Sequence, residues 1–135
     1  MSSITVIKSV ALSIRGFDLA PKNVESIVGV AASELGMRGE PVRQGVKALL
    51  KRSFVRFSVS FPDGCRLDEM IPALLIYLGG INHIRECRDK IKPEFLEIDM
   101  ILPVKNSDEQ EGGFIAPSTL AELSQLGASL SFQFL

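Results

Sequence analysis

Phe54-Val55-Arg56-Phe57-Ser58-Val59-Ser60-Phe61 is the stretch of this chain that decides its fold class. Apolar residues alternate with one arginine and two serines, and a period of two is typical of a strand that buries one face and exposes the other. A Pro-Asp-Gly turn at 62–64 ends the stretch. The pattern predicts a half-buried strand whose inward residues are Val55, Phe57, Val59 and Phe61.

Three further stretches alternate in the same way, at Ile4–Ile14, Leu96–Leu102 and Leu130–Phe134. Lys8 interrupts the inner face of the first, and an inward charge indicates a strand end or a sheet edge. The last strand extends over Ser129–Leu135, and we expect it inside the sheet, because a strand at a chain end is ordered only when it is paired.

Segments with helical spacing lie between the strands. A helix is predicted to start at Pro21, with Gly36 closing it or the loop after it, and others cover Leu67–Leu78 and Ile81–Ile91. A last helix opens at Pro117 and stops at Gly127. Its Thr119 and Glu122 have capping-box spacing, and it directs three leucines to the core: Leu120, Leu123 and Leu126. Residues 37–53 are predicted to be a basic loop leading into irregular strand.

These elements together predict the fold class. The chain has 135 residues, which is near the commonest size of one domain. We therefore expect a single α+β domain over residues 1–135, with a mainly antiparallel sheet of about four to six strands and three or four helices packed on one face.

Composition excludes several classes of protein. Apolar residues make up 46% of the chain and charged residues 23%, which is typical of a globular domain. The longest apolar run, 71–78, is far shorter than the roughly 20 residues that a membrane-spanning helix needs. The segment 1–8 lacks the features of a signal peptide. We expect a cytoplasmic protein with no membrane partner.

Charge is balanced overall and uneven locally. The net charge is -1, which gives no global attraction for nucleic acid. Residues 36–56 carry six cations and one anion: Arg38, Arg43, Lys47, Lys51, Arg52, Arg56 and Glu40. Residues 94–111 carry six anions and Lys105: Glu94, Glu97, Asp99, Asp108, Glu109 and Glu111. Such segments are most often solvated surfaces, and the alternative is that one of them binds a partner.

Candidate catalytic residues are few. His83 is the only histidine, and it lies in a predicted helix between apolar residues, which favours an ordinary boundary histidine. Glu97 and Asp99 share the outward face of one strand, without a third ligand or a nearby histidine, so a solvated acidic face is the simpler interpretation. Cys65 lies at a helix start, where a thiol pKa is lowered, but no histidine is near it in sequence. We assign no catalytic residue, no cofactor and no metal.

The two ends of the chain resemble a known family. The N-terminal part reads Gly16-Phe17-Asp18-Leu19-Ala20-Pro21 and then Val24-Glu25-Ser26-Ile27-Val28-Gly29-Val30. The C-terminal part reads Gly113-Phe114-Ile115-Ala116-Pro117-Ser118 and then Leu123-Ser124-Gln125-Leu126-Gly127-Ala128-Ser129-Leu130. These motifs are similar to those of a small bacterial family of unknown function, DUF four-two-seven-nine. The resemblance implies a compact α+β domain and transfers no site residue.

Three classes of function stay open. The first is a non-enzymatic protein-binding domain, in its most concrete form an immunity protein that occludes a basic bacterial toxin domain through the acidic residues Glu94, Glu97, Asp99, Asp108, Glu109 and Glu111. The second is a self-associating or scaffold domain that uses an edge strand or the serine-rich outer face, which would make a homodimer. The third is a small enzyme or ligand-binding domain built on Cys65, His83 and the pair Glu97 and Asp99. Nucleic acid is not expected as a partner, since Phe57 belongs to the inward set and a nucleic-acid-binding sheet needs exposed aromatic residues.

Overall fold

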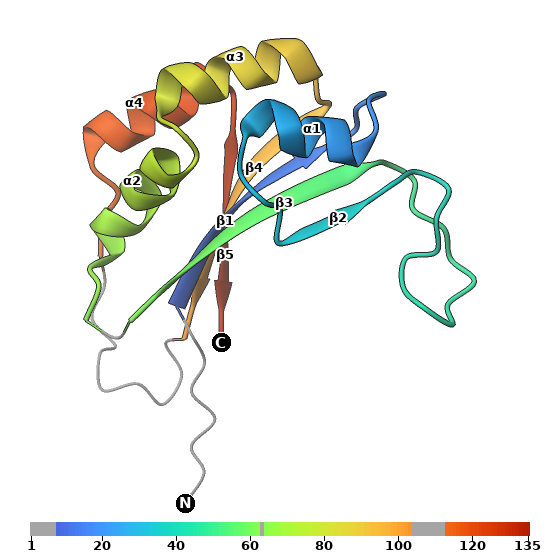
Figure 1. The fold of residues 1–135 in the computed structure, drawn as a ribbon. Helices are drawn as coiled ribbons and strands as arrows, with labels where there is room; N and C mark the ends of the chain where they lie inside the picture. The colour runs from blue at the N-terminus through green and yellow to red at the C-terminus, as the bar shows by residue number, and fades with distance from the viewer. Residues whose placement is uncertain (1–7, 63, 104–112) are drawn as a thin grey trace, which may run out of the picture.

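The computed structural model describes residues 8–62, 64–103 and 113–135. Four helices lie on one side of a five-stranded sheet, as Figure 1 shows. Three of the four strand pairings are antiparallel. The predicted α+β class, the mainly antiparallel sheet and the helices on one face are confirmed.

The strand order is β2-β3-β1-β4-β5. β1 (Lys8–Arg15) lies at the centre, antiparallel to β3 (Phe54–Phe61) on one side and to β4 (Phe95–Leu102) on the other. Lys8 therefore marks a strand end, and a position at the sheet edge is wrong. Its ammonium group donates a hydrogen bond to the Cys65 carbonyl at 2.8 Å. The predicted residues 4–7 of this strand lie outside the described residues.

β5 (Ser129–Phe134) lies at the edge of the sheet, where it runs parallel to β4. The expectation of a place inside the sheet is wrong, although the strand is paired along its length. The α4 helix (Pro117–Leu126) lies in the connection that returns the chain to the end of the sheet where β4 begins. A crossover connection of this kind makes the next strand parallel to the one before it.

The opposite edge is a short strand that the sequence pattern did not predict. β2 (Glu34–Gly36) pairs with β3, with Gly36 opposite Phe54. Gly36 therefore does not close the first helix. α1 (Pro21–Val28) ends at Gly29, which adopts the left-handed conformation, with φ of 86°, that glycine accepts without strain.

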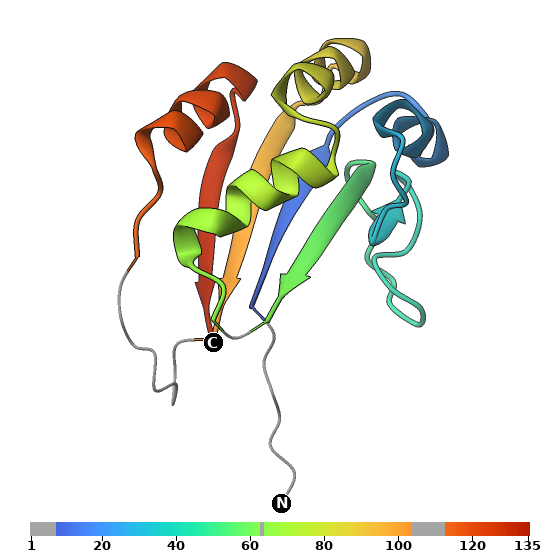
Figure 2. The same ribbon diagram turned by 60° about the vertical axis from the view of Figure 1, so that its left-hand side comes forward.

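The helix layer is built as the spacing predicted, apart from its caps. α2 (Leu67–Tyr77) and α3 (Ile81–Ile91) follow one another through Gly79 and Gly80, and Figure 2 shows all four helices on the same side of the sheet. The capping box predicted in α4 is wrong, because the helix begins one turn earlier, after Ala116, and the Thr119 side chain is buried.

One hydrophobic core lies between the helices and the sheet. The inward residues of β4 are all buried, and Val55 and Phe57 of β3 are fully buried. α4 contributes Leu123 and Leu126, but Leu120 is 49% exposed, so its predicted role in the core is wrong. The other side of the sheet has no helix over it among the described residues. We call this side the open face (Figure 2).

Candidate functional site

A network of charged and hydroxyl side chains crosses the open face. It consists of six residues from four neighbouring strands: Ser13 and Arg15 from β1, Arg56 from β3, Glu97 and Asp99 from β4, and Ser131 from β5. Each holds an outward position in the alternation of its strand, so the period of two that buries the core also directs these side chains to one surface. We call this set the polar network.

Strand register brings the members together. Ser13 lies opposite Arg56 on one side and opposite Glu97 on the other. Asp99 lies opposite Ser131. Residues that are directly opposite one another in a sheet have their Cβ atoms about 5 Å apart, so these side chains meet without any loop to position them.

Asp99 is the centre of the polar network. One of its carboxylate oxygens accepts hydrogen bonds from the Ser13 hydroxyl, at 3.0 Å, and from the Arg56 guanidinium, and the other accepts one from Ser131. Burial alone would raise the pKa of Asp99, but hydrogen bonds with Glu97, Ser131, Arg56 and Ser13 outweigh it and lower the pKa from its ordinary 3.8 to about 2. The carboxylate is therefore ionised and saturated with donors.

Glu97 has the opposite electrostatic environment. A hydrogen bond shared with Asp99 raises the pKa of Glu97, and burial and the negative charge of Asp99 raise it further. The Arg15 guanidinium, 2.9 Å from the Glu97 carboxylate, opposes this shift. Glu97 is therefore the member of the pair that takes up a proton first as the pH falls.

An exposed aromatic ring lies at one end of the open face. Phe95 is 46% exposed, opposite Arg15 in the register. The Arg52 guanidinium lies 4.9 Å from the centre of the Phe95 ring and that of Arg15 lies 5.9 Å from it, both within the range of cation–π attraction. Arg52 also forms an ion pair with Glu94 at 3.0 Å. This end of the open face is thus amphipathic, with an apolar ring close to two cations.

The acidic residues predicted to bind a partner do not form a single acidic surface among the described residues. Glu97 and Asp99 are side by side on the open face, and Glu94 lies at its end beside Phe95. Each is paired with an arginine from another part of the chain: Glu94 with Arg52, Glu97 with Arg15, and Asp99 with Arg56. Asp108, Glu109 and Glu111 lie outside the described residues.

The candidate catalytic groups do not converge. His83 lies in the helix layer, where its Nε2 atom is 2.8 Å from the Val28 carbonyl oxygen and 3.5 Å from the Cys87 sulfur. Glu97 and Asp99 are on the other side of the sheet. Cys65 is near the start of α2, and burial followed by the charge of Glu69 raises the pKa of its thiol, which corrects the lowered value expected at a helix start.

Cys87 is the one partner of His83 that the sequence spacing could have indicated, since the two are four residues apart on α3. It is 4% exposed, and burial raises the pKa of its thiol. A raised thiol pKa leaves less of the nucleophilic thiolate at neutral pH. The His83–Cys87 contact lies within α3 and gives no activated nucleophile. The two side chains join α3 to α1 through the carbonyl oxygens of Val28 and Ile27.

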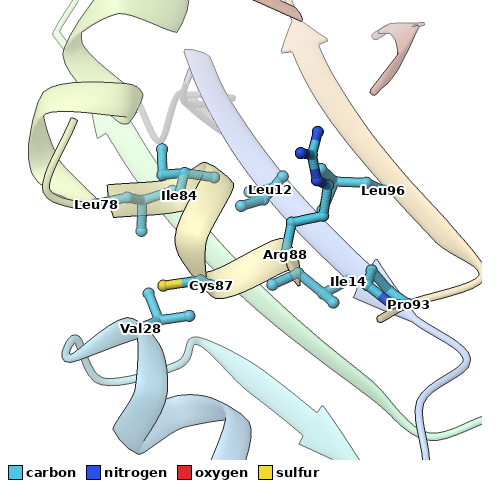
Figure 3. A pocket seen from close by; sticks show the side chains of 9 residues that line it. All are labelled: Leu12, Ile14, Val28, Leu78, Ile84, Cys87, Arg88, Pro93 and Leu96. Atoms are coloured by element: carbon cyan, nitrogen blue, oxygen red, sulfur yellow. The ribbon is translucent and has the colours of Figure 1, made fainter. Parts of the chain in front are cut away.

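A small cavity lies beside Cys87, between the helices and the sheet (Figure 3). Its lining residues are Leu12, Ile14, Val28, Leu78, Ile84, Cys87, Arg88, Pro93 and Leu96. Its volume is about 10 Å³, room for no more than about one water molecule. The cavity is on the opposite side of the sheet from Glu97 and Asp99, so it cannot serve them as a substrate pocket.

The part of the chain that the structure describes has neither a cluster of metal ligands nor a membrane-spanning helix. No group of three or more histidine, cysteine, aspartate or glutamate residues there could hold a metal ion. None of the helices described is long and apolar enough to cross a membrane.

The fold and the open face define a class of protein: a single α+β domain in which helices cover one side of the sheet and the polar network lies on the other side. The sequence model of the family described as Domain of unknown function (DUF4279) matches residues 5–135, and the chain belongs to this family. Comparison with curated proteins and with solved structures gave no match.

The sequence pattern named neither Ser13 nor Arg15 as a site residue. It included Arg56 only as a member of the basic segment and Ser131 only as a member of the serine-rich outer face. The alternation did place Ser13, Arg15 and Arg56 on outward positions. What it lacked was the strand order, which decides which outward residues are neighbours.

Proposed function

We propose that this chain is a non-enzymatic protein-binding domain, and in its most specific form a toxin-neutralising immunity protein of a bacterial competition system, acting in the cytoplasm. The observation that supports the proposal is the open face: a sheet surface over which no described helix lies, with prearranged charges and an exposed aromatic ring at its end. A partner that docks on such a surface requires little rearrangement of the domain.

The composition of this surface fits a protein interface. Arginine and aromatic residues are enriched among the side chains that dominate binding energies, and Phe95 between Arg15 and Arg52 has that composition. The polar network around it is tied together by hydrogen bonds, so its side chains lose little freedom when a partner covers them. The ring and its two arginines are the expected centre of the interface.

The pairing of the acids changes the chemistry expected of the partner. An unpaired acidic patch would attract any basic toxin domain. On the open face, Glu97 and Asp99 are already neutralised by Arg15 and Arg56. Recognition there depends on matching alternating charges and hydroxyl groups, which gives specificity more than long-range attraction.

The test is a pull-down of the tagged protein from its own organism at low and at moderate salt, with mass spectrometry of the proteins that co-elute. The variant Phe95→Ala removes the exposed ring, and we expect it to weaken capture about tenfold or more. Its matched control is Ile76→Ala, because Ile76 is 77% exposed on α2, away from the open face. The control should capture the partner as the unchanged protein does.

The immunity role is then tested with the captured protein itself. A partner that stops cell growth when expressed alone, and no longer does so when this chain is co-expressed, supports the proposal. If the captured partner is not toxic, the protein-binding function stands and the immunity role is rejected. The cells used must be shown to produce the proteins encoded by the genes next to that of this chain. If no stoichiometric partner then elutes, the protein-binding function and the immunity role are both contradicted.

Self-association is the second candidate, and the β5 edge is the observation that favours it. β5 has neither a charged residue nor a proline, which are the usual protections of an edge strand. Phe132 and Phe134 are 46% and 56% exposed and stack on one another. An uncharged strand can pair with its own copy without placing like charges opposite each other.

A further inference from the structure

Residues 37–52 form an arm that projects from the body of the domain. In Figure 1 the segment leaves the end of β2, extends away from both the helices and the sheet, and returns to β3. All of its residues are exposed except Val46 and Leu50, which are half-buried. The prediction of a basic loop is thus refined, because the segment has an ordered backbone.

Hydrogen bonds hold the arm in a hairpin-like shape. Leu50 donates its backbone N–H to the Glu40 carbonyl at 2.8 Å, Val42 donates to Ala48 at 2.8 Å, and Pro41 and Leu49 form an isolated bridge. The base is fixed by Ser53, which is 5% exposed and accepts the Arg38 N–H at 2.9 Å. Fixing this segment in one conformation costs conformational entropy, although the segment contributes little to the core.

The arm carries the largest unbalanced charge among the described residues. Arg38, Arg43, Lys47 and Lys51 form no ion pair with a described residue, whereas Arg52 at the base is paired with Glu94. The one anion of the arm, Glu40, accepts the backbone N–H of Met37. The acids of β4, in contrast, are neutralised within the protein. Among the described residues, the arm is therefore the segment that can attract an acidic partner at long range.

Apolar side chains accompany these cations. Met37, Val42 and Leu49 are 45%, 52% and 56% exposed. The arm has no aromatic residue that could stack on a base, and base stacking supports most binding of single-stranded nucleic acid. Exposed aliphatic residues gain most from burial in an apolar depression of a protein.

We propose that the arm is the element that engages the protein partner, and that it inserts into an acidic groove with an apolar floor on that partner. The inference rests on the proposed function and specifies the partner's chemistry. Arg52 connects the two surfaces, since it ends the arm and stacks on Phe95. The arm and the Phe95 end of the open face thus form one continuous contact surface.

The first test measures affinity for the purified partner by titration calorimetry at two salt concentrations. The double variant Arg43→Glu/Lys47→Glu reverses both charges at the tip. We expect it to weaken binding about tenfold or more and to reduce the salt dependence. The matched control Arg85→Glu/Lys90→Glu makes the same charge change on exposed residues of α3, and it should bind within about twofold of the unchanged protein.

The second test identifies what the arm touches. A photo-crosslinking residue is placed at Gln44 on the arm, at Ser60 on the open face, or at Glu86 on α3. Crosslinks from position 44 to a peptide of the partner rich in aspartate and glutamate support the proposal. Crosslinks to nucleic acid, to a basic peptide, or from position 60 alone overturn it.

The two levels of proposal fail in different ways. If a stoichiometric partner binds and the arm variant binds as tightly as the control, the arm proposal is wrong and the protein-binding function stands. If no partner binds at any salt concentration, the protein-binding function and the arm proposal fall together. Circular dichroism of each variant before titration separates a loss of binding from a loss of folding.

Discussion

Asp99 shows how one residue holds the open face of the sheet together. It accepts hydrogen bonds from three other strands, from Ser13, Arg56 and Ser131. Its side chain is 16% exposed, and that of Arg56 is 21% exposed, so the pair is well removed from water. An ion pair in this position is stabilising only while both partners are present, because either charge alone has lost its hydration.

Asp99→Asn is therefore predicted to destabilise the protein by about 2 kcal/mol at pH 7. Because folding lowers the pKa of Asp99 from 3.8 to about 2, its contribution is complete above pH 4 and is lost as the pH falls through about 2. The stability difference between the two proteins should narrow below pH 4. Urea unfolding followed by circular dichroism at pH 7 and pH 3 measures it, and an equal difference at both pH values would contradict this role.

Glu97→Gln is the matched variant with the opposite expectation. Folding raises the pKa of Glu97, so its stabilising effect is present at low pH, where it is protonated, and is lost as the pH rises. Glutamine imitates the protonated form and can still donate to Asp99. The variant should be at least as stable as the unchanged protein at pH 7 and equal to it at low pH. If the variant has a lower free energy of unfolding than the unchanged protein at pH 7, the attraction between Arg15 and Glu97 outweighs the repulsion between Glu97 and Asp99.

At the scale of the element, helical spacing identifies a helix more reliably than it identifies the buried face. In α4, Leu120, Leu123 and Leu126 all fit one stripe, yet Leu120 is 49% exposed and the buried residue of the first turn is Thr119. Three residues correspond to 300° of rotation, so a run at i, i+3, i+6 drifts across the helix surface.

Leu123→Ala and Leu120→Ala test this assignment as a pair. Leu123 is 4% exposed, and its truncation should leave a cavity and reduce the free energy of unfolding by about 3 kcal/mol. Leu120→Ala should change it by less than about 0.5 kcal/mol. Both are measured by urea unfolding, and similar losses in the two variants would mean that α4 is rotated relative to its described position.

At the scale of the whole molecule, the two edges of the sheet are unequal. The β2 edge is three residues long and leads into the arm, while the β5 edge is six residues long and uncharged. If β5 pairs with a second copy, the protein should elute as a dimer from a sizing column with light scattering, and Phe132→Lys should convert it to a monomer. Leu120→Lys is the control, at an equally exposed position on α4. A monomer at high concentration rejects the pairing.

The sequence by itself determined every described helix and every described strand except β2, because alternation and helical spacing are local consequences of backbone geometry. The inward faces of β3 and β4, the α+β class and the single helix layer followed from that pattern, and the acidic and basic segments are properties of the sequence alone.

Only the tertiary structure decided which strands are neighbours, and strand order depends on contacts between distant parts of the chain. It put β1 at the centre and β5 at the edge, and it made β2 out of three residues with no pattern of their own. It also paired Glu97 and Asp99 with arginines from β1 and β3. Four cations of the arm, in contrast, form no ion pair with a described residue: Arg38, Arg43, Lys47 and Lys51. The charge available to attract a partner is the charge not neutralised by ion pairs within the protein. Which ion pairs form depends on distances in the folded structure.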